Sequence, residues 1–165
     1  MSVLVKMTGS EYKENVLLCK GAPEMLLTRC NRIMLQDGTV QKITKAEQKE
    51  LIELSQDMAS TPLRVLALAM KDDLPAALKT MAKGDEGKGH EMLNTAPENY
   101  VKIEKDMIFL GLAGIKDPAR PEVKESIERC QTAGMRVIMI TGDTKPTAEA
   151  IGREIGLFDE DESIE

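Results

Sequence analysis

The sequence predicts an α/β protein in two parts: an α+β part with an antiparallel sheet, then part of a doubly wound unit. Three observations lead to this prediction. Asp37-Gly38 lies between two extended runs, which is typical of a β-hairpin. Capping and proline signals place helices between the strands. After Pro121 a helix, a strand and a second helix follow in turn, which is half of a doubly wound unit.

The composition is that of a soluble globular protein. Of the 165 residues, 42% are apolar and 30% are charged, which is enough for a real core. Aromatic residues make up only 2%, so aliphatic side chains and the 11 methionines have to fill the interior. The net charge is −6 and the basic residues are scattered. We therefore expect no nucleic-acid partner.

Cysteine and histidine usage argues against a metal centre. Cys19, Cys30 and Cys130 are widely spaced, and His90 is the only histidine in the sequence. This pattern favours reduced, buried thiols over a zinc site or a histidine-based triad. The longest apolar run, residues 107–115, is too short to span a bilayer, so we expect the chain as given to be soluble.

The first 30 residues predict a hairpin and a short helix. Residues 2–6 and 15–20 are two extended runs around a turn at residues 8–10. Pro23 suits the first turn of a helix. Lys20 ends the second strand beside Gly21, which permits close approach of a ligand to the backbone. Lys20 therefore either binds an anionic or aromatic ligand or is a solvated strand end.

A second hairpin and a long helix follow. Residues 32–35 and 39–43 flank the Asp-Gly turn, and residues 44–47 form a capping box that opens a helix to about Ala59. We expect the buried side of this helix to carry Leu51, Leu54 or Ser55, and Met58.

Residues 63–70 predict a nearly continuous apolar strand with Arg64 as its one charge. An arginine at the head of a buried strand needs a partner, which is either a structural carboxylate or a ligand phosphate. The stretch 71–105 is polar and contains glycines, and residues 83–90 within it indicate a mobile surface excursion. Residues 107–115 return to a strand.

Residues 116–121 are the clearest boundary in the chain. Pro118 and Pro121 stiffen this segment, and the composition changes across it. We therefore place a hinge here, carried by Asp117, Pro118 and Arg120. Pro121 begins a helix to about Ala133, which Gly134 ends.

A buried strand is predicted at residues 136–140, followed by the turn Thr141-Gly142-Asp143 and a helix with Thr144 as its cap. Such a turn presents free N–H groups and a positive dipole end, which suits a phosphate. Gly142 lets the backbone approach a ligand, Thr141 offers a hydroxyl donor, and Asp143 offers a carboxylate. The alternative is an ordinary turn whose polar residues cap the helix.

Four segments, in this order along the chain, resemble the cytoplasmic region of P-type cation ATPases. Residues 63–69 and 156–158 look most like the sarco/endoplasmic reticulum type calcium pumps, and the resemblance covers nearly the whole chain. The four segments are Met1-Ser2-Val3, Lys20-Gly21-Ala22-Pro23-Glu24, residues 117–123, and residues 139–143 with Thr147-Ala148.

The resemblance implies that residues 1–116 are the C-terminal part of the nucleotide-binding domain. Residues 117–165 then belong to the phosphorylation domain, which is similar to the haloacid dehalogenase fold. Lys20, with Gly21 beside it, matches the lysine of the adenosine pocket, and Arg64 matches an arginine on the phosphate or ribose side. Thr141, Gly142 and Asp143 match the loop beside the transferred phosphoryl group. The implied ligands of the parent pump are ATP and Mg²⁺.

The family's phosphorylated motif, Asp-Lys-Thr-Gly-Thr, does not occur in this sequence, nor does Gly-Asp-Gly-x-Asn-Asp. We therefore predict an inactive fragment with no catalytic residue and no metal ligand. Its implied partners are the remaining cytoplasmic and transmembrane domains, with the cation bound outside the fragment. The implied location is the cytosolic face of the endoplasmic reticulum membrane. The alternatives are another P-type cation pump, a haloacid-dehalogenase-like phosphatase, or a non-enzymatic interaction domain.

Overall fold

The computed structural model describes residues 1–7, 13–61, 63–93 and 100–159. The chain divides into two compact units. The sheet unit comprises Met1–Ile52 and Leu66–Ala113, and the loop unit comprises Glu53–Val65 and Gly114–Glu165. The mixed α/β class predicted from the sequence is confirmed by a six-stranded sheet with helices.

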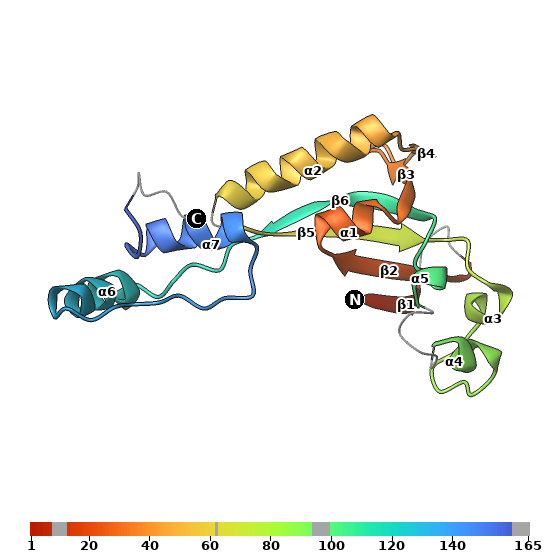
Figure 1. The fold of residues 1–165 in the computed structure, drawn as a ribbon. Coiled ribbons are helices and arrows are strands. Elements are labelled where there is room, and N and C mark those ends of the chain that lie inside the picture. Colours follow the sequence, from red (N-terminus) through yellow and green to blue (C-terminus); the bar gives the residue numbers. More distant parts are fainter. Residues whose placement is uncertain (8–12, 62, 94–99, 160–165) are drawn as a thin grey trace. The chain divides into compact units, whose positions relative to one another are not determined.

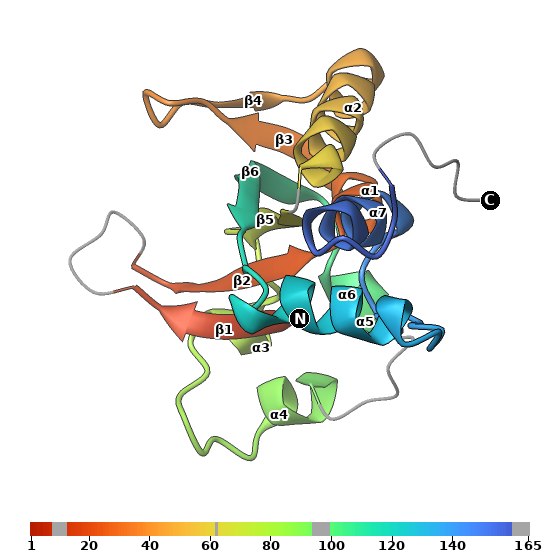
Figure 2. The same ribbon diagram turned by 90° about the vertical axis from the view of Figure 1, so that its left-hand side faces the viewer.

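The sheet has the strand order β1-β2-β5-β6-β3-β4, visible from bottom to top in Figure 2. Strands β1/β2, β2/β5 and β3/β4 pair antiparallel, whereas β3 and β6 pair parallel. The mainly antiparallel pairing agrees with the prediction. The strands are β1 (Ser2–Lys6), β2 (Asn15–Gly21), β3 (Cys30–Met34), β4 (Val40–Lys42), β5 (Arg64–Lys71) and β6 (Met107–Ile115).

Both predicted hairpins are confirmed. In the first, β1 and β2 pair from Ser2 opposite Cys19 to Lys6 opposite Asn15. The turn predicted at residues 8–10 lies outside the described residues. In the second, β3 and β4 meet at a turn in which Gly38 has a φ of 85°, a conformation that glycine adopts without strain.

Helices α1 (Pro23–Leu27) and α2 (Lys45–Ser60) contribute to the core on one face of the sheet (Figures 1 and 2). The capping box is present, because the Glu47 N–H donates to Thr44 Oγ1 at 3.2 Å and the Thr44 N–H donates to Glu47 Oε2 at 2.7 Å. Of the two alternatives for the buried side, Ser55 is buried and Leu54 is exposed. The core cluster under the helices contains Cys19, Leu26, Leu27, Cys30, Ala67, Ala69, Met107 and Phe109.

The polar stretch after β5 has more structure than predicted. It contains the short helices α3 (Ala76–Lys79), α4 (Lys88–Leu93) and α5 (Tyr100–Ile103). Leu74, Leu78 and Ile103 pack with Leu17 of β2 in a second core cluster. A few apolar residues within a polar stretch are thus enough to dock it on the sheet. Residues 83–88 and His90 are exposed, as expected for a surface excursion, although residues 88–90 begin a helix.

The loop unit contains helices α6 (Glu122–Thr132) and α7 (Lys145–Glu154). Gly134 follows α6 with a φ of 74°, as predicted for a glycine that ends a helix. The buried strand predicted at residues 136–140 is wrong: this segment has no strand conformation, and Ile140 is 94% exposed. A strand needs hydrogen-bonding neighbours, and none of the described strands pairs with this segment.

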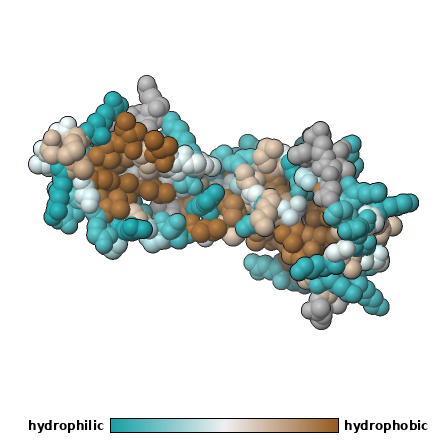
Figure 3. Space-filling view, turned by 90° about the horizontal axis from the view of Figure 1, so that it is seen from below, coloured by the Kyte–Doolittle hydropathy of each residue, from teal (hydrophilic) through white to brown (hydrophobic). Residues whose placement is uncertain are grey.

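Apolar side chains gather on the surface of the loop unit. A hollow of about 460 Å³ lies between α6 and the segment after it, lined in part by Val123, Ile127, Cys130 and Val137. Figure 3 shows hydrophobic surface at the end of the view that holds α6. In the part of the chain that the structure describes, no helix has the length and apolar character needed to cross a membrane.

Candidate functional site

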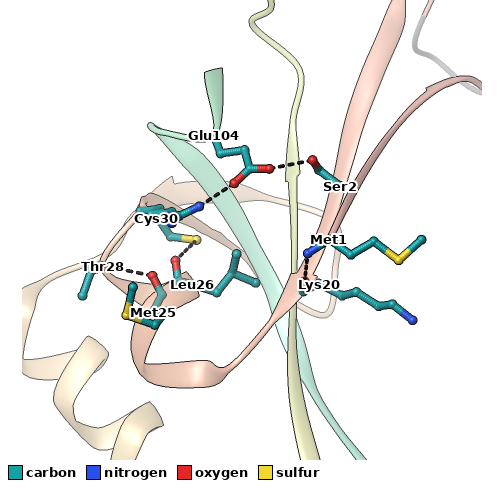
Figure 4. A network of polar contacts seen from close by, with 9 residues as sticks. Met1, Ser2, Lys20, Met25, Leu26, Thr28, Cys30 and Glu104 are labelled. Carbon is teal, nitrogen blue, oxygen red and sulfur yellow. Dashed lines mark hydrogen bonds and ion pairs between the residues drawn. The ribbon is translucent and has the colours of Figure 1, made fainter. Parts of the chain in front are cut away.

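Lys20 lies on the open face of the sheet. Side chains alternate along β2, so Lys20 and Leu18 point to the face opposite the buried Cys19. The backbone of Lys20 is held by Met1: the Lys20 N–H donates to the Met1 carbonyl at 2.9 Å, and the Met1 nitrogen donates to the Lys20 carbonyl at 2.9 Å. Figure 4 shows the Lys20 side chain extending away from the contact between Ser2 and Glu104. The register therefore positions an exposed cation on this face.

An apolar hollow of about 350 Å³ lies beside this lysine. Its walls come from three neighbouring strands, β1, β2 and β5, and Leu68 of β5 lies directly opposite Lys20. Apolar walls beside one ammonium group suit a flat, partly apolar ligand that carries negative charge. Sequence reasoning missed the hollow, although strand alternation could have placed its residues on one face. They include Met1, Val3, Val5, Leu18, Lys20 and Leu68.

Gly21 and Gly142 both border open space. A Cβ atom built on either residue would have no neighbouring atom within 4 Å, and neither backbone has the positive φ that favours glycine. The conformation of the chain thus does not require glycine at these two positions. The local structure is compatible with another reason for glycine, namely that a ligand approaches the backbone at these positions.

Arg64 begins β5, but its side chain is 68% exposed. The first residue of the strand therefore lies outside the core. Its Nε atom lies 3.8 Å from Oδ1 of Asp143. The sequence predicted either a carboxylate or a ligand phosphate as the partner of Arg64, and the structure contains the carboxylate of Asp143. An exposed pair at this distance contributes little to stability, about 0–1 kcal/mol.

The Thr141-Gly142-Asp143 turn is held by its own side chains. The Thr141 hydroxyl donates to Asp143 Oδ2 at 2.8 Å, and the Asp143 N–H donates to Thr141 Oγ1 at 3.1 Å. The Thr141 hydroxyl proton, which was expected to be available to a ligand, is thus used within the turn. Asp143 connects this turn to Arg64, so the structure brings Arg64, Thr141 and Asp143 together in the loop unit.

Thr147 is a residue that sequence reasoning gave no role. Its side chain is buried, its Oγ1 donates to the Leu63 carbonyl at 3.2 Å, and it lies 3.0 Å from the Thr144 hydroxyl. Thr144 is at the helix cap but makes no side-chain capping bond, unlike the prediction. The first turn of α7 is therefore tied to the residue next to Arg64, which positions Arg64 near the turn.

The predicted hinge residues lie between β6 and α6. Asp117, Pro118 and Arg120 are exposed and belong to neither a helix nor a strand. The division between the two units falls just before them, between Ala113 and Gly114. Close packing favours glycine at position 114, because a Cβ atom there would lie 3.1 Å from Leu63 Cδ1.

No group of three or more potential metal ligands occurs among residues 1–7, 13–61, 63–93 and 100–159. Asp143 is a single carboxylate, so these residues do not by themselves form a Mg²⁺ site. In the core, burial raises the pKa of the Cys30 thiol to about 12, with a smaller contribution from Cys19.

A family model described as P-type ATPase, cytoplasmic domain N, matches residues 1–122. The chain belongs to the P-type ATPase family. The resemblance drawn from the motifs is thereby confirmed, and the Lys20 hollow lies inside the matched range of this P-type ATPase chain.

Curated relatives are calcium-transporting ATPases. The chain is 40% identical over 158 residues to calcium-transporting ATPase 4, endoplasmic reticulum-type, of Arabidopsis thaliana, covering 96% of this chain and 15% of the relative. It is 40% identical over 165 residues to endoplasmic reticulum calcium ATPase srcA of Aspergillus fumigatus, and this match covers 99% of this chain and 15% of the relative. It is 36% identical over 143 residues to calcium-transporting ATPase 1 of Bacillus cereus, and this match covers 87% of this chain and 14% of the relative. The chain thus spans about one seventh of the length of these relatives.

Proposed function

We propose that this chain is an ATP-binding part of the cytoplasmic region of an ATP-driven calcium pump. The observation that carries the proposal is Lys20 beside an apolar hollow on the open face of the sheet. It lies within the residues that match the nucleotide-domain family model. The printed names of the relatives support calcium as the transported ion.

In this proposal Lys20 and Gly21 hold the adenosine end of ATP. The apolar side chains of Leu18 and Leu68 provide a surface on which a flat base can pack. The Lys20 ammonium group then attracts the electron-rich base or the negative charge of the nucleotide. The open space beside Gly21 lets the ligand reach the backbone at the end of β2.

The proposal also assigns the phosphate groups of ATP to four residues of the loop unit: Arg64, Thr141, Gly142 and Asp143. A guanidinium group binds phosphate oxygens through a fixed pair of donors, and Arg64 is exposed enough to do so. Asp143 orients this guanidinium group in the absence of nucleotide. Gly142 offers backbone access at the turn that Thr141 and Asp143 shape.

Family membership supports the remaining assignments of the proposal. We propose that residues 1–116 are the C-terminal part of the nucleotide-binding domain and that residues 117–165 belong to a haloacid-dehalogenase-like phosphorylation domain. Asp117, Pro118 and Arg120 form the hinge, since two prolines confine bending to few bonds. The parent pump uses ATP with Mg²⁺, transports its cation outside this region, and exposes this region on the cytosolic face of the endoplasmic reticulum membrane.

Titration of the chain with ATP, followed by amide chemical shifts, tests the proposal. We expect weak binding, with a dissociation constant on the order of 1 mM, or about −4 kcal/mol. The largest shift changes should surround Lys20 and Arg64. Lys20→Ala should weaken binding, whereas Lys42→Ala on β4 should not.

No ATP hydrolysis is expected from the chain with any divalent ion, because the phosphorylated motif is absent from the sequence. Equal binding by the Lys20 and Lys42 variants would refute the assignment of the nucleotide face. Sustained hydrolysis that disappears in Asp143→Ala would instead support a haloacid-dehalogenase-like phosphatase.

A further inference from the structure

A second hollow, of about 610 Å³, lies on the sheet face opposite Lys20. Strand register decides the face: Leu4 pairs with Leu17, and Lys6 pairs with Asn15. Directly opposed residues of an antiparallel pair share a face, and Leu17 points to the side opposite Leu18 and Lys20. A nucleotide bound beside Lys20 therefore does not occupy this hollow.

The hollow concentrates positive charge in a chain whose net charge is −6. Four lysines, from three segments of the chain, line it, and no carboxylate is among its described lining residues. Glu14 pairs with one of them, since its Oε2 lies 3.1 Å from the Lys79 ammonium group. We call this site the lysine hollow; its lysines are Lys6, Lys13, Lys79 and Lys83.

One wall of the lysine hollow is held in place by a buried amide. Asn15 is 5% exposed, and its Nδ2 donates to the carbonyls of Leu78 and Met81, both at 2.8 Å. These two bonds tie the segment that carries Lys79 and Lys83 to strand β2. The backbone positions of Lys79 and Lys83 relative to β2 are thus set before any ligand binds, which lowers the entropy cost of binding.

We propose that the lysine hollow binds a small polyanion that carries two or more phosphate groups. Ammonium groups are compact point charges that pair with phosphates, and several of them around one cavity favour a multiply charged ligand. The volume lies within the range of pockets that hold small molecules. The polyanion and the Glu14 carboxylate compete for the Lys79 ammonium group, and the two negative charges repel each other, so Glu14 opposes binding.

Calorimetric titration of the full chain with inorganic tripolyphosphate at low salt tests the proposal. The double substitution Lys79→Gln and Lys83→Gln should weaken binding by about tenfold, since each exposed charge contributes a few-fold. Glu14→Gln should strengthen binding by about threefold, because it removes the competitor. Lys42→Gln is the matched control on β4 and should change nothing. Binding should also weaken as salt rises.

A second arm identifies the source of the phosphates. Vesicles of phosphatidylcholine with and without a phosphatidylinositol bisphosphate are sedimented with the chain and with the same variants. Binding to free tripolyphosphate supports a soluble polyphosphate, and binding confined to the bisphosphate vesicles supports a lipid headgroup, provided that the Lys79/Lys83 variant weakens it. Absence of binding in both arms would overturn the proposal. Equal weakening by Lys42→Gln, or weakening by Lys20→Gln, would overturn it as well.

Discussion

Replacing Gly142 by alanine tests whether this glycine serves a ligand or the fold. In the ligand-free chain a Cβ at Gly142 meets no atom within 4 Å, and the backbone does not have a positive φ. Alanine therefore fits without strain and restricts the unfolded chain. We expect the free energy of unfolding to rise by about 0.4–1 kcal/mol.

Gly134→Ala is the matched control in the same unit. A Cβ at Gly134 also meets open space, but its φ of 74° disfavours any residue with a side chain. Alanine there should lower the free energy of unfolding by about 1–2 kcal/mol. Both variants replace glycine by alanine, and both positions border open space. Opposite changes in the free energy of unfolding would therefore identify the backbone conformation as the cause.

Urea unfolding measures both stability changes, and amide shifts during ATP titration measure binding. With Gly142→Ala, the ATP-induced shifts of Thr141 and Asp143 should disappear, while those around Lys20 should persist. If Gly142→Ala destabilises the chain as much as Gly134→Ala does, the glycine has a structural role that the reasoning missed. If ATP shifts Thr141 and Asp143 equally in both variants, no ligand approaches the backbone at this turn.

Three further predictions concern stability and reactivity. Gly152→Ala should destabilise the chain by about 1–3 kcal/mol in urea unfolding, because its Cβ would lie 2.4 Å from the ring of Phe158; an unchanged midpoint would mean that the ring moves aside freely. Although burial alone would raise the pKa of Asp72, the hydrogen bond and charge of Arg32 hold it below its ordinary value of 3.8. A carboxyl with a lowered pKa stabilises the fold above its unfolded pKa and loses that effect as the pH falls, so the destabilisation by Asp72→Asn should be complete at pH 7 and shrink below about pH 4. A pH-independent difference would refute the ionic role. Burial raises the pKa of Cys30 to about 12, so mass spectrometry after iodoacetamide treatment at pH 8 should find this thiol alkylated only in unfolded chain; rapid alkylation of folded chain would contradict its burial.

The sequence by itself determined the features that depend on a few neighbouring residues. Asp37-Gly38 specifies its hairpin because the turn needs a positive φ at the glycine, and Gly134 ends α6 for the same reason. Thr44 and Glu47 satisfy each other's backbone groups within one helical turn. The motifs that indicated the P-type ATPase family are also short and local, and the family match agrees with them.

Only the tertiary structure decided which side chains the rest of the chain covers. The apolar run at residues 136–140 has the composition of a buried strand, yet it is exposed because no described strand pairs with it. Arg64 was expected to need a carboxylate or a phosphate as its partner, and only the fold brings the Asp143 carboxylate near it. The Lys20 hollow and the lysine hollow both arise from residues of separate strands and turns. Burial and hollows depend on contacts between distant segments, and local preferences do not encode which segments meet.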